Sequence, residues 1–412
     1  RVVTYINNRN NVFDLKDGFG HYFYDGTKAP VGAISSGSAS WNGRIVGSDN
    51  GDADKLATQA TSSDQPVSDG YKVTFADNTD FLTIPSTSQA GWQIVGTSLG
   101  TFAYRVNANA VTELNLLGNF GSAFYRKAGQ SYGMILLPES ATGADIESAR
   151  RLLIDRGSLD GSLASAYFAN WNRRHDIVEF HSVDLSNATN VSSAWDNCSS
   201  LTTFPALNLS GATNISYSWY NCLSLSDFRT TDIKNGNNFT SAWQNCTALT
   251  SFPAGAKLGT AATGVNFTDA FRTCTSLEAL PDNLDMSSGD DFGNTFYQCT
   301  SLATIGSGVL LGTANATATV DYAGLFNGAT SLTAVPANFD LSKGNSLRFA
   351  FNNCPSLTTI GSGVLLGTAA SNVDFTSAFK GCTNLVTLPT NLNLSKGDEF
   401  VDAFRECSSL VD

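Results

Sequence analysis

The chain has 412 residues, 15% of them charged, and a formal net charge of −12 at pH 7. This length is sufficient for two or three domains. Phosphate binding requires clustered Lys and Arg side chains, so a sparsely charged acidic chain is not expected to bind nucleic acid. No run of about 18 apolar residues occurs, and the sequence therefore predicts no membrane-spanning segment.

Residues 1–142 contain short segments in which apolar and polar residues alternate, separated by turns rich in Gly and Asn. Alternation with a period of two is typical of strands that bury one face. We expect strands at residues 71–75, 80–84, 92–95, 102–106, 114–117 and 133–137. Strands at this spacing indicate an antiparallel sandwich or jelly roll, so we interpret residues 1–142 as an all-β, sandwich-like domain.

One acidic segment of this domain is a weak candidate for a metal site. Asp49, Asp52 and Asp54 lie close together in a polar stretch, and Ca²⁺ is bound by six to eight oxygen atoms. The usual twelve-residue calcium loop with a terminal glutamate is missing. We therefore favour a solvated acidic loop, and we expect no metal and no cofactor.

Residues 143–182 are expected to form a helical cap on the solenoid described next. Ile146, Ala149 and Leu152 recur on one side of a predicted helix at residues 145–156, and Gly157 follows as a residue that ends helices. A strand is predicted at residues 177–180. Together these elements could cover the apolar face of the first repeat.

From residue 183 onward the sequence repeats a single frame. Every cysteine of the chain is followed three residues later by leucine, and in one further copy Ala329 stands in the cysteine's place. We call this cysteine or alanine the frame residue, and we number the coils 1 to 9 by their frame residues: Cys198, Cys222, Cys246, Cys274, Cys299, Ala329, Cys354, Cys382 and Cys407. Successive frame residues are 24 to 30 positions apart, which is in the range of leucine-rich repeats.

Each coil also has an aromatic residue three positions before its frame residue, an apolar residue seven before it and usually Ala four before it. These offsets fit one face of a helix, and the apolar residue six positions after the frame residue, commonly followed by Pro, predicts a short strand and a turn. Residues 183–412 are thus expected to form an α/β leucine-rich-repeat solenoid of about nine coils. The predicted repeat core comprises Trp195, Cys198, Leu201, Trp219, Cys222, Leu225, Trp243, Cys246, Leu249, Phe271, Cys274, Leu277, Phe296, Cys299, Leu302, Phe326, Leu332, Phe351, Cys354, Leu357, Phe379, Cys382, Leu385, Phe404, Cys407 and Leu410.

The regular spacing and even number of cysteines also allow a disulfide framework. We favour reduced, buried thiols, because a thiol on the apolar stripe packs as a small hydrophobic group and Ala329 replaces one of them. A zinc site is disfavoured because no C-x-x-C pair occurs and His21, His175 and His181 all precede the repeats.

The strings SAWQNCTALTSFP, DAFRTCTSLEALP and SAFKGCTNLVTLP resemble the BspA-like leucine-rich repeats of bacterial surface proteins, mycoplasmas, protists and marine bacteriophage genomes. The resemblance covers roughly residues 176–412. It implies display on a virion surface or outside the cell, a role in binding, and no catalytic residues.

We therefore expect a non-enzymatic virion surface protein, a tail fibre or fibre-like adhesin that binds a host cell-surface glycan or protein and contacts other virion proteins. Fibres of this class are commonly homo-oligomers, and we expect a trimer. The alternatives are a bacterial cell-surface adhesin or appendage subunit, an architectural capsid or tail decoration, and a tailspike polysaccharide hydrolase. The hydrolase is disfavoured because no G-x-S-x-G, H-E-x-x-H or Cys–His arrangement occurs in the sequence. The chain does contain many carboxylates, which are the catalytic groups of glycosidases, so the hydrolase stays an alternative.

No polar capping segment follows Leu410, whereas solenoids normally cover their last apolar face. The expectation is a longer polypeptide, or a partner chain that covers this end.

Overall fold

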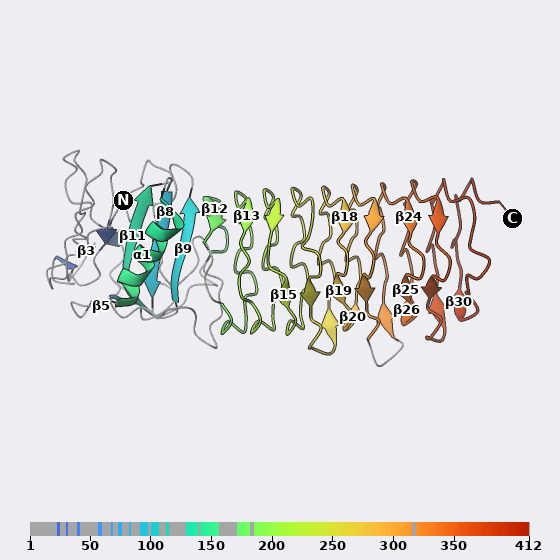
Figure 1. Ribbon diagram of the computed structural model, residues 1–412, viewed down its shortest axis with the longest axis horizontal. Helices are drawn as coiled ribbons and strands as arrows, with labels where there is room; N and C mark the ends of the chain where they lie inside the picture. Colours follow the sequence, from blue (N-terminus) through green and yellow to red (C-terminus); the bar gives the residue numbers. More distant parts are fainter. Residues whose placement is uncertain are drawn as a thin grey trace. The chain divides into compact units, whose positions relative to one another are not determined.

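Before residue 139 the computed structural model describes only the strands. After it, the model describes residues 141–155, 171–181, 185–314 and 319–411. It divides into two compact units, Arg1–Asn187 and Ala188–Asp412. Figure 1 labels several elements of each unit.

Strands of the first unit overlap all six segments expected in residues 1–142. β2, β3, β4, β7 and β10 form one antiparallel sheet. In the second antiparallel sheet the order is β12-β9-β8-β11-β6-β5, and β1 also pairs with β11. The sandwich arrangement itself stays a prediction. The strands are β1 (Phe23–Tyr24), β2 (Pro30–Val31), β3 (Ala39–Trp41), β4 (Ala57–Gln59), β5 (Val67–Ser68), β6 (Val73–Phe75), β7 (Leu82–Thr83), β8 (Gly91–Thr97), β9 (Gly100–Val106), β10 (Glu113–Leu114), β11 (Gly129–Pro138) and β12 (Ile177–Phe180).

The helix expected at residues 145–156 is present as α1 (Gly143–Asp155). Its apolar residues Ile146 and Ala149 are buried against Trp92 and Ile94 of β8 and Ala103 of β9. The apolar stripe therefore docks the helix on the second sheet, as the sequence pattern requires. Its role as a cap for the repeats stays a prediction.

A buried ion pair fixes the segment that leads into β12. The guanidinium of Arg174 donates to both carboxylate oxygens of Asp176, at 2.7 and 2.6 Å, and lies over the ring of Tyr104 at 5.1 Å. Burial by itself lowers the pKa of Arg174, but the Asp176 carboxylate and the Tyr104 hydroxyl together outweigh that effect and raise it. Arg174 is therefore a charged structural residue of the first unit.

The second unit is a β-solenoid of about nine turns, and its coils follow one another in chain order (Figure 1). Short parallel strands recur at three places around the coils, although not every coil has a strand at each place. The first series is β13 (Thr203–Phe204), β14 (Asp227–Phe228), β18 (Ala279–Leu280), β21 (Thr304–Ile305), β24 (Ala334–Val335) and β27 (Thr359–Ile360). The second is β15 (Asp232–Ile233), β16 (Lys257–Leu258), β19 (Asp285–Met286), β22 (Leu310–Leu311), β25 (Asp340–Leu341) and β28 (Leu365–Leu366). The third is β17 (Val265–Asn266), β20 (Gly289–Asp291), β23 (Val320–Asp321), β26 (Gly344–Ser346), β29 (Val373–Asp374) and β30 (Gly397–Glu399).

The expected helix in each coil is wrong, and the α/β class is corrected to a β-solenoid. Among residues 188–314 and 319–411 the segment before each frame residue is a run of turns. The residues five and one before the frame residue have a positive φ in every coil, as at Ser193 (55°) and Asn197 (58°) of coil 1. A left-handed residue at every fourth position cannot belong to a right-handed helix.

Backbone hydrogen bonds show what replaces the helix. Within a coil, N–H groups donate to the carbonyl three residues earlier, as Cys198 does to Trp195 at 3.1 Å. Between coils, the N–H groups seven, five, three and one positions before the frame residue donate to carbonyls of the next coil, at 2.7–3.0 Å, at every step from coil 1 to coil 9. The coils are therefore joined directly on this side as well as through their strands.

The interior is a column of stacked aromatic rings. The rings three positions before the frame residue stack from coil to coil without a break, with centroids 4.8–5.5 Å apart. The Phe side chains six positions after the frame residues of coils 1 to 3 meet the Trp rings edge-on, as Phe204 meets Trp195 at 4.7 Å. Since one coil cannot enclose its own ring, each coil depends on its neighbours for burial.

Candidate functional site

The cysteines of the predicted core do not form a reactive site. All eight are free thiols, and all but Cys407 are fully buried. From coil 2 onward each thiol donates to the carbonyl of the aromatic residue in the preceding coil, as Cys222 does to Trp195 at 3.1 Å. Burial raises the pKa of these thiols, to about 12 at Cys299 and Cys382. A thiol that stays protonated is the opposite of an activated nucleophile.

The other predicted core residues also lie inside the second unit. The aromatic residue and the leucine of coils 1 to 8 are at most 1% exposed, and Phe404 and Leu410 of coil 9 are partly exposed. The repeated residues are thus a scaffold. Any recognition by the solenoid must come from residues outside this set.

The calcium candidates Asp49, Asp52 and Asp54 lie outside the described residues. Within the described ranges there is no group of His, Cys, Asp and Glu side chains that could hold a metal ion. No helix in the described part of the chain is long and apolar enough to cross a membrane.

The candidate site is the side of the solenoid formed by the turns before each frame residue. We call it the turn face, and we define it as the residues six, five, two and one positions before the frame residue in each coil. The left-handed residues at two of these positions let the chain turn outward and then return an apolar pair to the interior. These left-handed residues are Ser193, Asn197, Tyr217, Asn221, Ser241, Asn245, Asp269, Thr273, Asn294, Gln298, Gly324, Gly328, Phe349, Asn353, Ser377, Gly381, Asp402 and Glu406.

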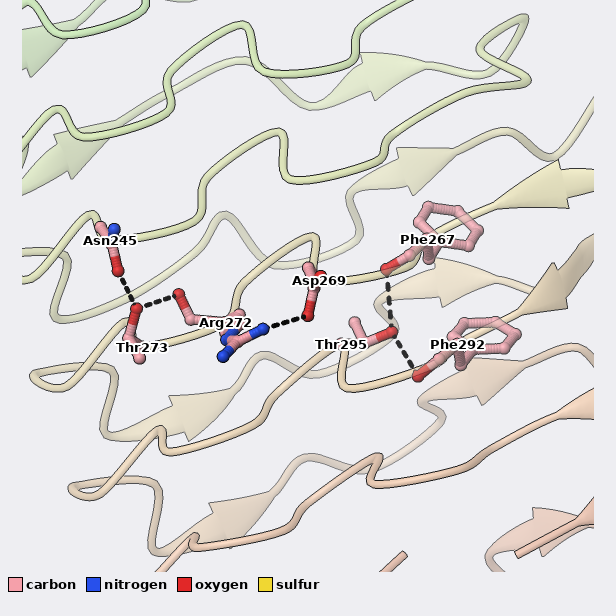
Figure 2. Close-up of polar contacts among 7 residues, drawn as sticks. All are labelled: Asn245, Phe267, Asp269, Arg272, Thr273, Phe292 and Thr295. Atoms are coloured by element: carbon pink, nitrogen blue, oxygen red, sulfur yellow. Dashed lines mark hydrogen bonds and ion pairs between the residues drawn. The ribbon is translucent and has the colours of Figure 1, made fainter. Parts of the chain in front are cut away.

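A ladder of side-chain amides follows one column of the turn face. The amide nitrogen of Asn221 donates to the Asn197 side-chain oxygen at 3.1 Å, and that of Asn245 donates to Asn221 at 2.7 Å. The hydroxyl of Thr273 continues the ladder by donating to Asn245, as Figure 2 shows. An amide has two N–H donors and an oxygen with two lone pairs, so a rung bonded on both sides retains capacity for a ligand.

The charged side chains of the turn face lie mainly in coil 4 and in coils 7 to 9. Arg272 of coil 4 pairs with Asp269 at 3.3 Å (Figure 2) and lies over the ring of Tyr297 at 4.9 Å. The turn-face residues of coils 1 to 3 include one charged side chain, Asp196. This part of the face is therefore dominated by hydroxyls, amides and two tyrosines.

A second column borders the turn face, eight positions before the frame residue. In coils 1 to 4 it consists of Asn190, Asn214, Asn238 and Asn266, and each side-chain oxygen accepts the N–H two residues later. In later coils Asp291, Asp321 and Asp374 accept the same bond. Burial raises the pKa of Asp321, and the neighbouring carboxylates of Asp291 and Asp374 raise it further.

Coil 2 carries an unusual left-handed residue. Tyr217 has φ of 57° and a side chain that is 42% exposed, and its ring meets that of Tyr220 edge-on at 5.6 Å. A left-handed backbone costs a residue other than Gly, Asn or Asp about 1–2 kcal/mol. Serine holds the same backbone conformation in coils 1 and 3, so the fold alone does not account for a large, half-exposed tyrosine here.

Sequence reasoning missed the turn face. It placed the segment on a helix and had no basis for bringing Asn197, Asn221 and Asn245 into one column. The recurrence of Asn, Ser and Gly five and one positions before the frame residue was the available signal, because Gly and Asn tolerate a positive φ.

Comparisons of the chain with protein-family models, with curated proteins and with solved structures found no match.

Proposed function

We propose that this chain is a non-enzymatic virion surface protein, a tail fibre or fibre-like adhesin, whose leucine-rich-repeat solenoid of BspA-like type binds the surface of a host cell. One observation carries the proposal. The interior positions are nearly constant from coil to coil, whereas the side chains at the turn-face positions differ between coils on the same backbone. Solenoids that use an extended surface for recognition are built in this way.

The variation is clear at a single turn-face position. Five residues before the frame residue stand Ser193, Tyr217, Asp269, Gly324 and Phe349 in coils 1, 2, 4, 6 and 7, all with the same left-handed backbone. Since the backbone requirement is constant, the choice of side chain is set by what lies outside the coil. Many such contacts along one face would add up to binding without any single strong site.

The reactivity of the buried groups supports a non-enzymatic role. The pKa values of Cys222, Cys246 and Cys274 are raised by burial, which keeps these thiols protonated. The frame residues therefore serve packing and the coil-to-coil hydrogen bonds.

Two measurements on intact particles test the proposal. A labelled antibody against residues 176–412 should decorate the particle surface, and the purified full chain should compete with particle adsorption to host cells. Label on bacterial cells in place of particles would indicate a bacterial adhesin and contradict the proposal. Label on particles without competition would indicate an architectural decoration, and shortening of host polysaccharide by the purified chain would indicate a hydrolase.

The assembly state is proposed with the function. A homotrimer would place three solenoids on one particle attachment point and multiply weak contacts by avidity. Light scattering of the purified full chain measures this directly, and a monomer at micromolar concentration would contradict it.

A further inference from the structure

The turn face of coil 2 differs from that of both neighbouring coils. Coil 2 has Tyr217 and Tyr220 five and two positions before its frame residue, and Leu223 one position after it. Coil 1 has Ser193, Asp196 and Ser199 at these positions, and coil 3 has Ser241, Gln244 and Thr247. We call Tyr217, Tyr220 and Leu223 the coil 2 patch.

The patch is exposed in the second unit. Tyr217 is 42% exposed and Leu223 is 46% exposed, and Tyr220 is partly exposed. Coils 1 and 3 make the same coil-to-coil hydrogen bonds with small polar residues at these positions. The three large side chains of coil 2 are therefore not needed to form the coil.

The size of the side chain on a left-handed backbone is the second observation that sets the patch apart. Tyr217 holds a φ of 57°, at a position where coils 1 and 3 have serine. Every coil has a left-handed residue at this position, so the fold accounts for the backbone of coil 2 but not for a large aromatic side chain on it.

The polar surroundings of the patch suit hydroxyl groups. The amide ladder of Asn197, Asn221 and Asn245 passes through coils 1 to 3, so it lies in the same coils as the patch. The ladder supplies both donors and acceptors, and a sugar hydroxyl can use either. Rigid tyrosines surrounded by Asn and Ser form an adaptable recognition surface.

We propose that the coil 2 patch is a binding subsite for an uncharged glycan, in which a pyranose ring stacks on Tyr217 or Tyr220 and its hydroxyls bond to the amides of Asn221 and Asn245. The inference rests on the proposed function, because it names the ligand class of the same solenoid. The glycan is uncharged because the turn face of coils 1 to 3 contains no Lys or Arg that could pair with an acidic sugar.

A glycan fits the patch better than a protein does. A stable protein interface buries about 800 Å² on each partner around an apolar core. The patch offers two tyrosines and one leucine among polar side chains, which is closer to the footprint of one or two sugars. Neighbouring amides of the ladder hydrogen-bond to each other at 3.1 and 2.7 Å, so the amides repeat once per coil, at a strand spacing of about 4.8 Å that is close to the length of one sugar residue. A linear glycan lying along the ladder would thus meet one amide per sugar.

The test compares the full chain with a double variant on an array of hexose oligosaccharides, followed by calorimetry on those that bind. The double variant is Tyr217→Ser with Tyr220→Gln, which gives coil 2 the residues of coil 3. We expect the unaltered chain to bind uncharged oligosaccharides, and the double variant to bind them at least about tenfold more weakly. The double variant should unfold at about the same denaturant concentration as the parent chain, because coils 1 and 3 form the same left-handed turn with serine at this position.

Phe349→Ser is the matched control. Phe349 is a second aromatic residue with a left-handed backbone, at the same position in coil 7. Its replacement should leave glycan binding unchanged. Equal loss in the control variant, or undiminished binding by the double variant, would overturn the inference.

Three further outcomes would also overturn it. These are exclusive binding of sulfated or uronic-acid sugars, no binding of any sugar on the array, and capture of a host surface protein through the patch. The proposed function is tested separately by competition with adsorption. If the full chain competes and the double variant competes equally well, the glycan subsite is wrong and the adhesin role stands.

Discussion

Replacing one ring in the middle of the aromatic column tests how far the solenoid depends on it. Phe296 of coil 5 is fully buried and stacks on Phe271 at 5.4 Å and on Phe326 at 5.5 Å. Phe296→Ala removes a buried ring and leaves a cavity that a repeating backbone cannot close, which costs about 3–5 kcal/mol. This free energy already includes the loss of two stacking contacts between rings, each worth about 0.5–1.5 kcal/mol.

Phe404→Ala is the control for this prediction. Among the described residues, Phe404 of coil 9 stacks on one ring, Phe379 at 5.3 Å, and it is partly exposed. The same truncation there should cost well below half of the value at Phe296, since less surface returns to water.

Native-state hydrogen exchange is the appropriate assay, because solenoids can unfold in parts and a single unfolding free energy is then undefined. Phe296→Ala should speed exchange in coils 4 to 6 first, and Phe404→Ala in coils 8 and 9 alone. Equal effects of the two variants, or uniform acceleration along the whole unit, would refute the view that each coil is stabilised by its neighbours.

Three further predictions concern single side chains. Asp321→Asn should stabilise the protein at neutral pH, by less than about 1 kcal/mol because the group is partly exposed. The folded-state pKa of Asp321 is raised, so this carboxyl contributes stability below its unfolded-state pKa and loses that contribution as the pH rises through the folded-state pKa. Chemical unfolding should therefore show that the stability gained by the variant shrinks towards acid pH. A gain that is constant with pH would argue against the raised pKa as its cause. Gly289→Ala should destabilise by about 1–3 kcal/mol or more, measured by thermal unfolding, since the added Cβ would lie 2.3 Å from Cζ of Phe292; an unchanged midpoint would contradict that packing. In the folded protein Cys407 should be alkylated first, being the partly exposed thiol, and mass spectrometry that finds another cysteine of the chain labelled faster would disprove the burial order.

Much of the solenoid could be predicted from the sequence, because the frame residues and their aromatic partners recur at fixed offsets and must lie on one buried stripe. The local backbone could not be predicted from the same offsets. Spacings of seven, four, three and zero fit a helix, and they fit equally well two successive turns that each end in a left-handed residue. The deciding signal lay in residues such as Asn197, Asn221 and Gly328, because Asn and Gly tolerate the positive φ that these turns require.

The candidate site was harder to predict, for a physical reason. Columns on a solenoid surface arise when residues about 25 positions apart are brought side by side, and the column to which a residue belongs depends on the backbone of every coil between them. Once the backbone of the turns is known, the repeat spacing places Asn197, Asn221 and Asn245 in one column. When the turns are not known, nothing in the sequence distinguishes Tyr217 from the other tyrosines of the chain.

The hydrogen bonds of the turn face have a further consequence. In an ordinary parallel sheet successive N–H groups point to opposite sides, so the peptide dipoles largely cancel. On the turn face the N–H groups at four alternate positions of a coil all point to the next coil, and the carbonyls that accept them all point back. These dipoles add along the stack in the manner of a helix dipole, so the field is positive towards coil 9, where the acidic residues Asp402 and Glu406 lie.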